Sequence, residues 1–390
     1  MTPFADFLYF GVSLYVLLPN LLLGWTKRLS RYWLLIAAAV MLVVQYGANR
    51  EILPGWVVWD LWVLLAYALF QFLLAQIYLT IHQHTRNRWF FYSAVLLSLL
   101  PLLLAKYLPL AQPSYAVVFV GLSYVTFRCL DTLIAIRDGL VKSIDPLAYF
   151  VFLLFFGSIS SGPIDRYQRF MGDWQKERSW PDFLQDLDGG LQRVMRGFLY
   201  KFILAELVSK YWMDPAAAGT GFWPTVSYMY AYTLYLFFDF AGYSAFAIGF
   251  CYFFGIHTPE NFDRPFISHN IRDFWNRWHI SLSTWFRDHV YSRFVMTAIK
   301  GKWFKNKYVA SYIGYGLSMG LMGIWHGTAW NYLVYGLYHS VLLILNDVIE
   351  RSNKKYHWIP KNNQAWNIFS IFVTIQLVCF GLLIFSGRLE

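Results

Sequence analysis

Residues 56–80 read WVVWDLWVLLAYALFQFLLAQIYLT, an apolar run with a single charged residue, Asp60. Its length suits a helix that crosses a membrane, which needs about 20 predominantly apolar residues. Of the 390 residues, 58% are hydrophobic and only 14% are charged, whereas soluble domains carry about 25% charge. The sequence therefore predicts an all-α polytopic membrane protein and argues against a soluble helical protein. Further apolar runs occupy residues 7–25, 32–46, 89–110 and 369–385.

The distribution of charge predicts the topology. The net charge is +10, and basic residues gather at 27–31, 86–88, 137–142, 166–178 and 264–307. Because basic loops stay in the cytoplasm, the N-terminus is expected outside. The first apolar run is expected to remain as a span, since MTPFADF lacks the basic region of a signal peptide. Nucleic-acid binding is not expected, because the charge lies in loops between spans.

The chain is expected to form a single integral membrane domain, residues 1–390, with about ten or eleven membrane segments. Regular spans fill residues 1–140, an irregular core follows in 141–350, and a last span lies in 351–390. Residues 150–159 are apolar but short and precede Pro163, which favours a segment that enters the membrane and returns inside the protein. No internal repeat is visible, which argues mildly against a transporter.

The core contains a polar block, residues 257–307, that we expect on the cytoplasmic side. Its sequence from residue 259 is PENFDRPFISHNIRDFWNRWHISLSTWFRDHVYSRFVMTAIKGKWFKNK. Within this block, mostly aromatic side chains recur at helical spacing with charged residues on either side, which predicts an amphipathic helix at the membrane interface. His279 is not part of this stripe, so the helix gives no reason for a histidine at this position, and Ser283 follows it by one turn. The side chains of the stripe are Phe274, Trp278, Trp285 and His289.

Two ionisable residues fall inside apolar segments. Asp239, in LFFDFAGYS, is expected either as a functional carboxylate or as a structural group satisfied by an arginine or a helix end. His326, in MGLMGIWHGTAW, is the stronger candidate, because a neutral imidazole can act as a general base near neutral pH. The alternative is a core histidine that donates one hydrogen bond. Glycines around His326 would let other backbone approach closely: Gly320, Gly323 and Gly327.

Several other sites are not indicated by the sequence. The three cysteines lie far apart in apolar runs, which predicts buried hydrophobic side chains rather than a metal site or disulfides: Cys129, Cys251 and Cys379. His82 and His84 alone are a weak metal signal. GYSAF around Ser244 lacks the second glycine of a nucleophile elbow. His339 would not share a helix face with His326 even on one continuous helix.

Four ordered segments resemble the membrane-bound O-acyltransferase (MBOAT) family. They are GSISSGPIDR, FDFAGYSAFAIG, FWNRWHISLSTWFRD and WHGTAWNYLVYGLYH. The resemblance implies a ring of transmembrane helices around a thin centre of short tilted helices, crossed by a tunnel. After FRD the chain continues HVYSRFVMTAIKGKWFKNKY, which is similar to the branch that transfers D-alanine. The polysaccharide O-acetylase branch typically has tyrosine and an IPLGG type of segment there. His289 stands where both branches are expected to have tyrosine, so it is not carried over as catalytic.

The resemblance also implies an activity and its residues. The chain would take D-alanine from the phosphopantetheine thioester of a cytoplasmic D-alanyl carrier protein and pass it across the membrane toward lipoteichoic acid. His326 would be catalytic and His279 the second family histidine. Polysaccharide O-acetyl transfer by the same His326 is the first alternative. A proton-coupled transporter that uses His326 and Asp239 is the second.

The expected partners follow from the same resemblance. They are the carrier protein, other membrane components of the D-alanylation system including a small peptide, lipoteichoic acid and the lipids of a bacterial cell membrane. The chain itself would bind no cofactor, because the phosphopantetheine arm belongs to the carrier. Acidic carrier proteins could be steered by basic side chains, unless that basic face binds lipid headgroups instead. The expected docking residues are Arg293, Lys300, Lys302 and Lys305, with Val295 and Met296 as apolar anchors.

Overall fold

The computed structural model describes residues 3–5, 7–23, 27–47, 57–111, 121–160, 162–360 and 363–390. Over these residues the secondary structure is helical, apart from an isolated antiparallel bridge between Phe262 and Trp278. The chain divides into two compact units. Unit 1 comprises Met1–Gly197 and Tyr243–Pro259, and unit 2 comprises Phe198–Gly242 and Glu260–Glu390. The all-α prediction is confirmed.

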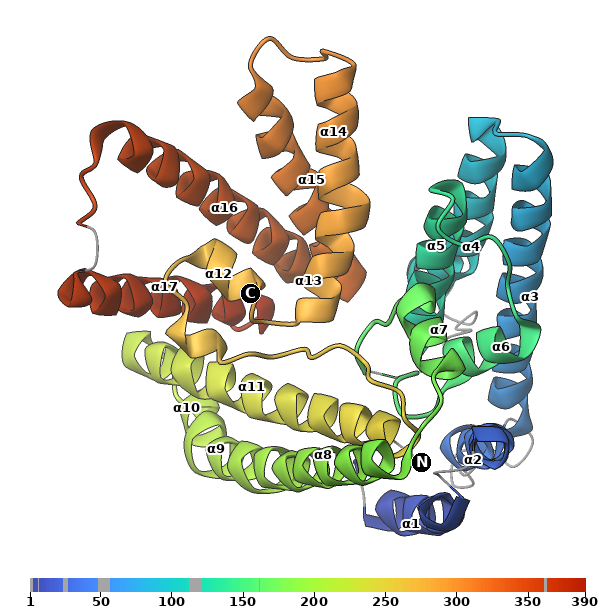
Figure 1. Ribbon diagram of the computed structural model, residues 1–390. Coiled ribbons are helices and arrows are strands. Elements are labelled where there is room, and N and C mark those ends of the chain that lie inside the picture. Colours follow the sequence, from blue (N-terminus) through green and yellow to red (C-terminus); the bar gives the residue numbers. More distant parts are fainter. Residues whose placement is uncertain are drawn as a thin grey trace. The chain divides into compact units, whose positions relative to one another are not determined.

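Unit 1 contains the first helices of the chain (Figure 1). α1 packs on α2 and α2 on α3, while α5 lies against both α3 and α4. The end of α11 also belongs to this unit. The helices are α1 (Phe7–Leu23), α2 (Lys27–Gly47), α3 (Val57–His84), α4 (Arg88–Ala111), α5 (Leu122–Arg137), α6 (Pro146–Leu154), α7 (Tyr167–Gln175) and α8 (Trp180–Phe198).

A buried arginine holds the irregular segment after α6. Arg128 of α5 is 1% exposed, and its guanidinium donates to the carbonyl oxygens of Phe152 at 2.7 Å and Ser158 at 2.8 Å. The last carbonyls of a helix have no partner within the helix, and Arg128 supplies one. α6 is only nine residues long, which is too short to cross a bilayer. α6 is therefore not a full span, which agrees with the short apolar segment noted at 150–159.

Unit 2 contains most of the remaining helices. Its elements include three π-helical turns, η1, η2 and η4, which interrupt the α-helices around them. The elements are η1 (Leu199–Ala205), α9 (Glu206–Val208), η2 (Ser209–Met213), α10 (Asp214–Ala218), α11 (Phe222–Phe253, as far as Gly242), η3 (Pro265–Ile267), α12 (Ile271–Trp275), α13 (Ile280–Phe286), η4 (Arg287–Tyr291), α14 (Ser292–Lys300), α15 (Lys307–His326), α16 (Trp330–Tyr356) and α17 (Gln364–Phe385).

α15 and α16 pack at backbone distance because glycines face each other. A Cβ at Gly323 would overlap the carbonyl group of Tyr332, and a Cβ at Gly336 would overlap that of Met319. Small residues allow such close crossings in membrane helices. The expected close approach is confirmed at Gly323, whereas a Cβ at Gly320 would meet no described atom within 4 Å.

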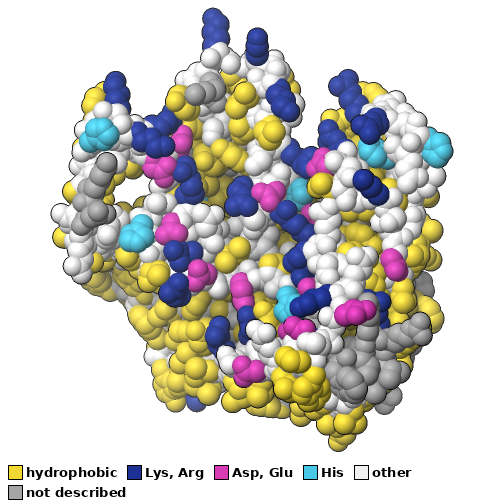
Figure 2. Space-filling view, in the orientation of Figure 1, with side chains coloured by type: hydrophobic (Ala, Val, Ile, Leu, Met, Phe, Trp, Pro, Cys, Tyr) yellow, Lys and Arg dark blue, Asp and Glu magenta, His cyan; other side chains and the backbone are white. Residues whose placement is uncertain are grey.

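Five described helices are long and apolar enough to cross a membrane: Asp60–His84, Arg88–Leu110, Phe222–Phe253, Trp330–Tyr356 and Gln364–Phe385. Two shorter apolar helices cover Phe7–Leu22 and Arg31–Tyr46. The protein is a multi-pass membrane protein, with fewer long spans in its described part than the ten or eleven segments expected. The difference arises partly because the polar block forms short helices. In addition, a further span is expected at 114–136, and its first residues, 114–120, lie outside the described part. Hydrophobic side chains cover large areas of the visible surface in Figure 2, as lipid-facing helices require.

Candidate functional site

His279 interrupts the helix that the sequence predicted across residues 274–289. Its backbone is left-handed, with φ of 43° and ψ of 51°, and it forms the N-cap of α13. A residue with left-handed φ and ψ cannot continue a right-handed α-helix, because every residue of such a helix needs negative φ. The prediction of one amphipathic helix is therefore wrong. Its apolar side chains are nevertheless buried, at 1% exposure for Phe274, 4% for Trp278 and 7% for Trp285.

The side chain of His279 is buried and lies next to Trp325. It is 5% exposed, its ring stands edge-on to Phe240 at 4.7 Å between centroids, and the Trp325 ring lies at 6.4 Å. Its Nε2 atom has no hydrogen-bond partner among the described residues. His279 lies outside the candidate spanning helices, and burial lowers its pKa, with the charge of His326 as a smaller cause. The imidazole is therefore neutral at physiological pH and can accept or donate a hydrogen bond.

His326 ends α15 and is surrounded by aromatic rings. Its centroid lies 4.7 Å from Trp325, 5.0 Å from Phe385 and 6.3 Å from Tyr332. The chain leaves α15 through Gly327, where a Cβ would overlap the ring of Tyr332. Both histidine rings therefore pack against Trp325. Unit 2 brings together the two histidines of the sequence motifs.

A cavity of about 370 Å³ opens beside the residues that follow His279. This volume lies within the usual range of small-molecule sites, about 300–1,000 Å³. Ser283 lines it, and the Ser283 hydroxyl donates to the Trp278 carbonyl at 3.1 Å, so this residue also fixes the turn at His279. The lining combines hydroxyls and an amide with apolar side chains, which suits a ligand with both amide and methylene groups. Other lining residues are Arg272, Trp275, Asn276, Ile280, Thr284, Arg287, Tyr291, Tyr315, Ser318, Met319, Met322 and Leu343.

The expected docking residues lie on and after α14. Met296 is 55% exposed, and the three lysines are exposed as well: Lys300, Lys302 and Lys305. Val295 and Arg293 are only partly exposed. Val295 faces α15, because a Cβ at Gly314 would lie 2.9 Å from its Cγ2 atom.

The sequence analysis missed two apolar side chains beside Met296. Ile299 is 51% exposed and Trp303 is 57% exposed. Ile299 lies three residues after Met296 on the same face of α14, a spacing that the sequence alone could have indicated. Trp303 follows the end of α14 at Lys300 and comes after Lys302, whose φ is 51°, so helical spacing does not predict its exposure.

Asp239 forms an ion pair with Lys201 of η1. The partner of Asp239 is thus a lysine, where the structural interpretation expected an arginine or a helix end. The three cysteines are buried and free, as predicted. Among the described residues, no group of three or more His, Cys, Asp and Glu side chains could hold a metal ion.

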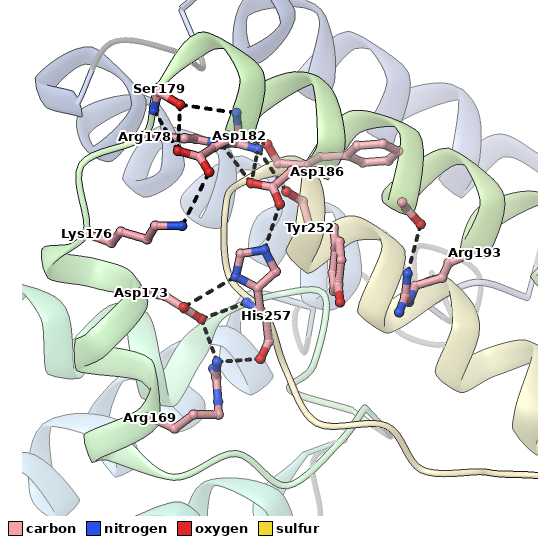
Figure 3. Close-up of polar contacts among 12 residues, drawn as sticks. Arg169, Asp173, Lys176, Arg178, Ser179, Asp182, Asp186, Arg193, Tyr252 and His257 are labelled. Carbon is pink, nitrogen blue, oxygen red and sulfur yellow. Dashed lines mark hydrogen bonds and ion pairs between the residues drawn. The ribbon is translucent and has the colours of Figure 1, made fainter.

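A second polar cluster, in unit 1, was not indicated by the sequence (Figure 3). His257 lies just after α11, with Nδ1 3.3 Å from Asp173 and Nε2 2.7 Å from Asp186. These two hydrogen bonds raise the pKa of His257 to about 9. Arg178 donates to Asp186 at 2.9 Å, and Arg169 contacts Asp173 at 2.5 Å. The cluster ties the end of α11 to α7 and α8, and no local pattern signals contacts so distant in the chain.

Comparisons with known proteins agree with these motifs. Residues 50–386 match the membrane-bound O-acyltransferase family. The chain is 43% identical to the teichoic acid D-alanyltransferase of Bacillus subtilis (strain 168), over 100% of this chain and 98% of that protein. It is 40% identical to the enzyme of the same name from Lacticaseibacillus rhamnosus, with the same coverage. A probable alginate O-acetylase, AlgI of Pseudomonas syringae pv. tomato, is 30% identical over 69% of this chain and 49% of its own length.

Proposed function

Since the chain belongs to the membrane-bound O-acyltransferase family and is an acyltransferase, we propose that the group it transfers is D-alanine. The donor is the phosphopantetheine thioester of a carrier protein, and the product leads to D-alanylated lipoteichoic acid. The observation that carries this proposal is the full-length similarity to teichoic acid D-alanyltransferases at 43% and 40% identity. The similarity to alginate O-acetylases is partial, so O-acetyl transfer is the second candidate.

His326 acts as the general base in this proposal. Its imidazole takes the proton of an acceptor hydroxyl, and the oxygen attacks the thioester carbonyl. The carbon–sulfur bond then breaks, and the proton passes from His326 to the leaving thiolate. General-base help of this kind typically contributes about 10²–10⁴-fold in rate. The position of His326 at the end of α15, with its ring against the same Trp325 that lies near His279, supports this role.

His279 and the adjacent cavity serve the donor. The cavity combines polar and apolar lining residues, as the amides and methylenes of a pantetheine arm require. The buried Nε2 atom of His279, which lacks a partner among the described residues, hydrogen-bonds the arriving donor. A buried polar atom gains most from such a bond, because leaving it unsatisfied costs about 1–3 kcal/mol.

The partners and the location complete the proposal. The carrier protein approaches α14 from the cytoplasm, and the N-terminus lies outside a bacterial cell membrane. Other membrane components of the D-alanylation system, including a small peptide, receive the acyl group or pass it on to lipoteichoic acid. The phosphopantetheine arm belongs to the carrier, so the chain holds no cofactor of its own.

The test is reconstitution in liposomes with a carrier protein charged with labelled D-alanine. Wild-type protein is expected to move the label to acceptor lipid, and His326→Ala to lower the rate by about 10²–10⁴-fold. Normal elution of the variant in size-exclusion chromatography controls for folding. Transfer at the wild-type rate by His326→Ala would remove the assignment of the base. Transfer of acetyl but not D-alanyl groups would favour the O-acetylase alternative, and substrate flux without acyl transfer would favour a transporter.

A further inference from the structure

Asn261 lies at the turn that places His279, although neither the motifs nor the mechanism include it. Its side chain is 0% exposed. The Asn261 carbonyl oxygen accepts a hydrogen bond from the Ile280 amide at 3.0 Å. Its Oδ1 atom accepts from the Ser281 hydroxyl at 2.6 Å and from the Ser281 amide at 3.4 Å. All three bonds go to the two residues that directly follow His279.

The same segment also holds the residues before His279. Phe262 and Trp278 form an antiparallel bridge, and the Asp263 amide donates to the Arg277 carbonyl at 3.0 Å. The two flanks of His279 are thus fixed to one short extended segment. A left-handed histidine is a sparsely populated conformation that persists only where the surroundings determine it. Asn261 supplies the part of that restraint on the C-terminal side of His279, because it accepts hydrogen bonds from the first two residues of α13.

The conformation decides where the imidazole lies. With φ at 43°, the chain turns at His279, and the ring stands against Phe240 and beside Trp325. Had residues 274–289 formed one helix, His279 would point to a different side from its present one, since side chains on a helix advance by about 100° per residue. The Nε2 atom, which has no partner within the described chain, would then lie elsewhere.

We propose that Asn261 is a positioning residue for acyl transfer, which fixes His279 in its left-handed conformation so that its Nε2 atom meets the donor. This inference rests on the proposed function of His279. It predicts that Asn261 acts through His279 and not as a general support of the fold. Asn261→Ala removes the Oδ1 atom that accepts from Ser281, whereas the main-chain carbonyl that accepts from the Ile280 amide remains.

The test is a double-mutant cycle on transfer from charged carrier, measured in the full-length protein. Asn261→Ala is expected to lower kcat about 10- to 100-fold, since a small misplacement of a reacting group has effects of this size. In a His279→Ala background the same substitution is expected to change kcat less than about twofold, because residues that act through one another are not additive.

The controls keep the outcome decisive. Asn363 caps α17, and its Oδ1 atom accepts from the Trp366 amide at 3.0 Å. Asn363→Ala therefore removes an asparagine oxygen that accepts at the start of another helix, and it should leave kcat unchanged. If Asn261→Ala does not fold, Ser281→Ala removes one donor to the same Oδ1 atom and enters the same cycle. An equal loss from Asn261→Ala with and without His279 would overturn the inference. A wild-type rate for His279→Ala would instead remove the proposed role of His279, whatever Asn261 does.

Discussion

At the scale of single residues, the site depends on one unusual backbone conformation. His279 is one of the few non-glycine residues with positive φ in the described chain, and such positions typically cost about 1–3 kcal/mol. The cost is offset by the hydrogen bonds to Asn261 and by burial of Trp278. Local strain of this kind is common at active sites. The sequence pattern gave His279 no role in a continuous helix. The structure supplies the reason, which is the left-handed backbone of His279.

The Lys201–Asp239 pair gives a prediction at the same scale. Both groups are partly buried, at 17% and 35% side-chain exposure. Removing one partner leaves the other charge without compensation, whereas removing both does not. Lys201→Met and Asp239→Asn alone are therefore expected to lower the melting temperature more than the double variant does. Thermal unfolding in detergent, followed by tryptophan fluorescence, measures this order.

The same pair also separates a structural from a functional carboxylate. If Asp239 only balances Lys201, the double variant should transfer D-alanine at close to the wild-type rate. A double variant that is stable but inactive would show that the charge itself takes part in the reaction. That result would revive the interpretation of Asp239 as a proton-relay group.

At the scale of elements, local sequence patterns predict the long helices, whereas contacts between distant parts of the chain determine where the short helices break. Apolar runs predicted α3, α4 and α17 closely, because membrane helices need long apolar stretches. The break between α12 and α13 could not be predicted, since it depends on a segment around Asn261 that pairs with it. The resemblance to the family indicated both histidines, whereas the neighbouring cavity required the packing of α12, α13 and α15.

The His257 cluster gives a prediction about how α7, α8 and the end of α11 are held together. Hydrogen bonds to Asp173 and Asp186 raise the pKa of His257 from the ordinary value of 6.5 to about 9. Protonated His257 therefore stabilises unit 1 fully below about pH 6.5, and this contribution is lost as pH rises toward and through 9. His257→Gln is expected to flatten the fall of the melting temperature between pH 6.5 and 9.5, roughly the window between the two pKa values.

A control variant and a second measurement test whether the pH dependence of stability comes from His257. His84→Gln, at an exposed histidine of unit 1, should leave the pH profile of the melting temperature as in the wild type. Hydrogen exchange should show that the amides of α7, α8 and the end of α11 lose protection as the pH rises through 9. Unchanged exchange there, or an identical profile for His257→Gln and wild type, would contradict the role of the cluster.

At the scale of the whole molecule, charge and topology determine how a soluble donor reaches a membrane enzyme. If the donor is the acidic carrier protein of the proposed function, the net charge of +10 would favour its association, because basic side chains raise association rates at low ionic strength. α14 combines this charge with the exposed side chains of Met296 and Ile299. Lipid headgroups would be attracted to the same lysines, and a bilayer would also bury the apolar side chains of the helix, so a substitution is needed to distinguish the two.

Met296→Asp therefore separates a docking surface from a lipid-binding face. The substitution is expected to raise the KM for charged carrier at least about fivefold, since loss of a central anchor typically costs more than about 1 kcal/mol and about 1.4 kcal/mol corresponds to tenfold. Raising salt should raise the wild-type KM with little change in kcat, because steering is screened and chemistry is not. Gln364→Asp adds the same charge at an exposed position of α17 and should leave KM unchanged. A normal KM for Met296→Asp, together with weaker flotation on anionic liposomes, would assign α14 to the membrane surface instead of the carrier.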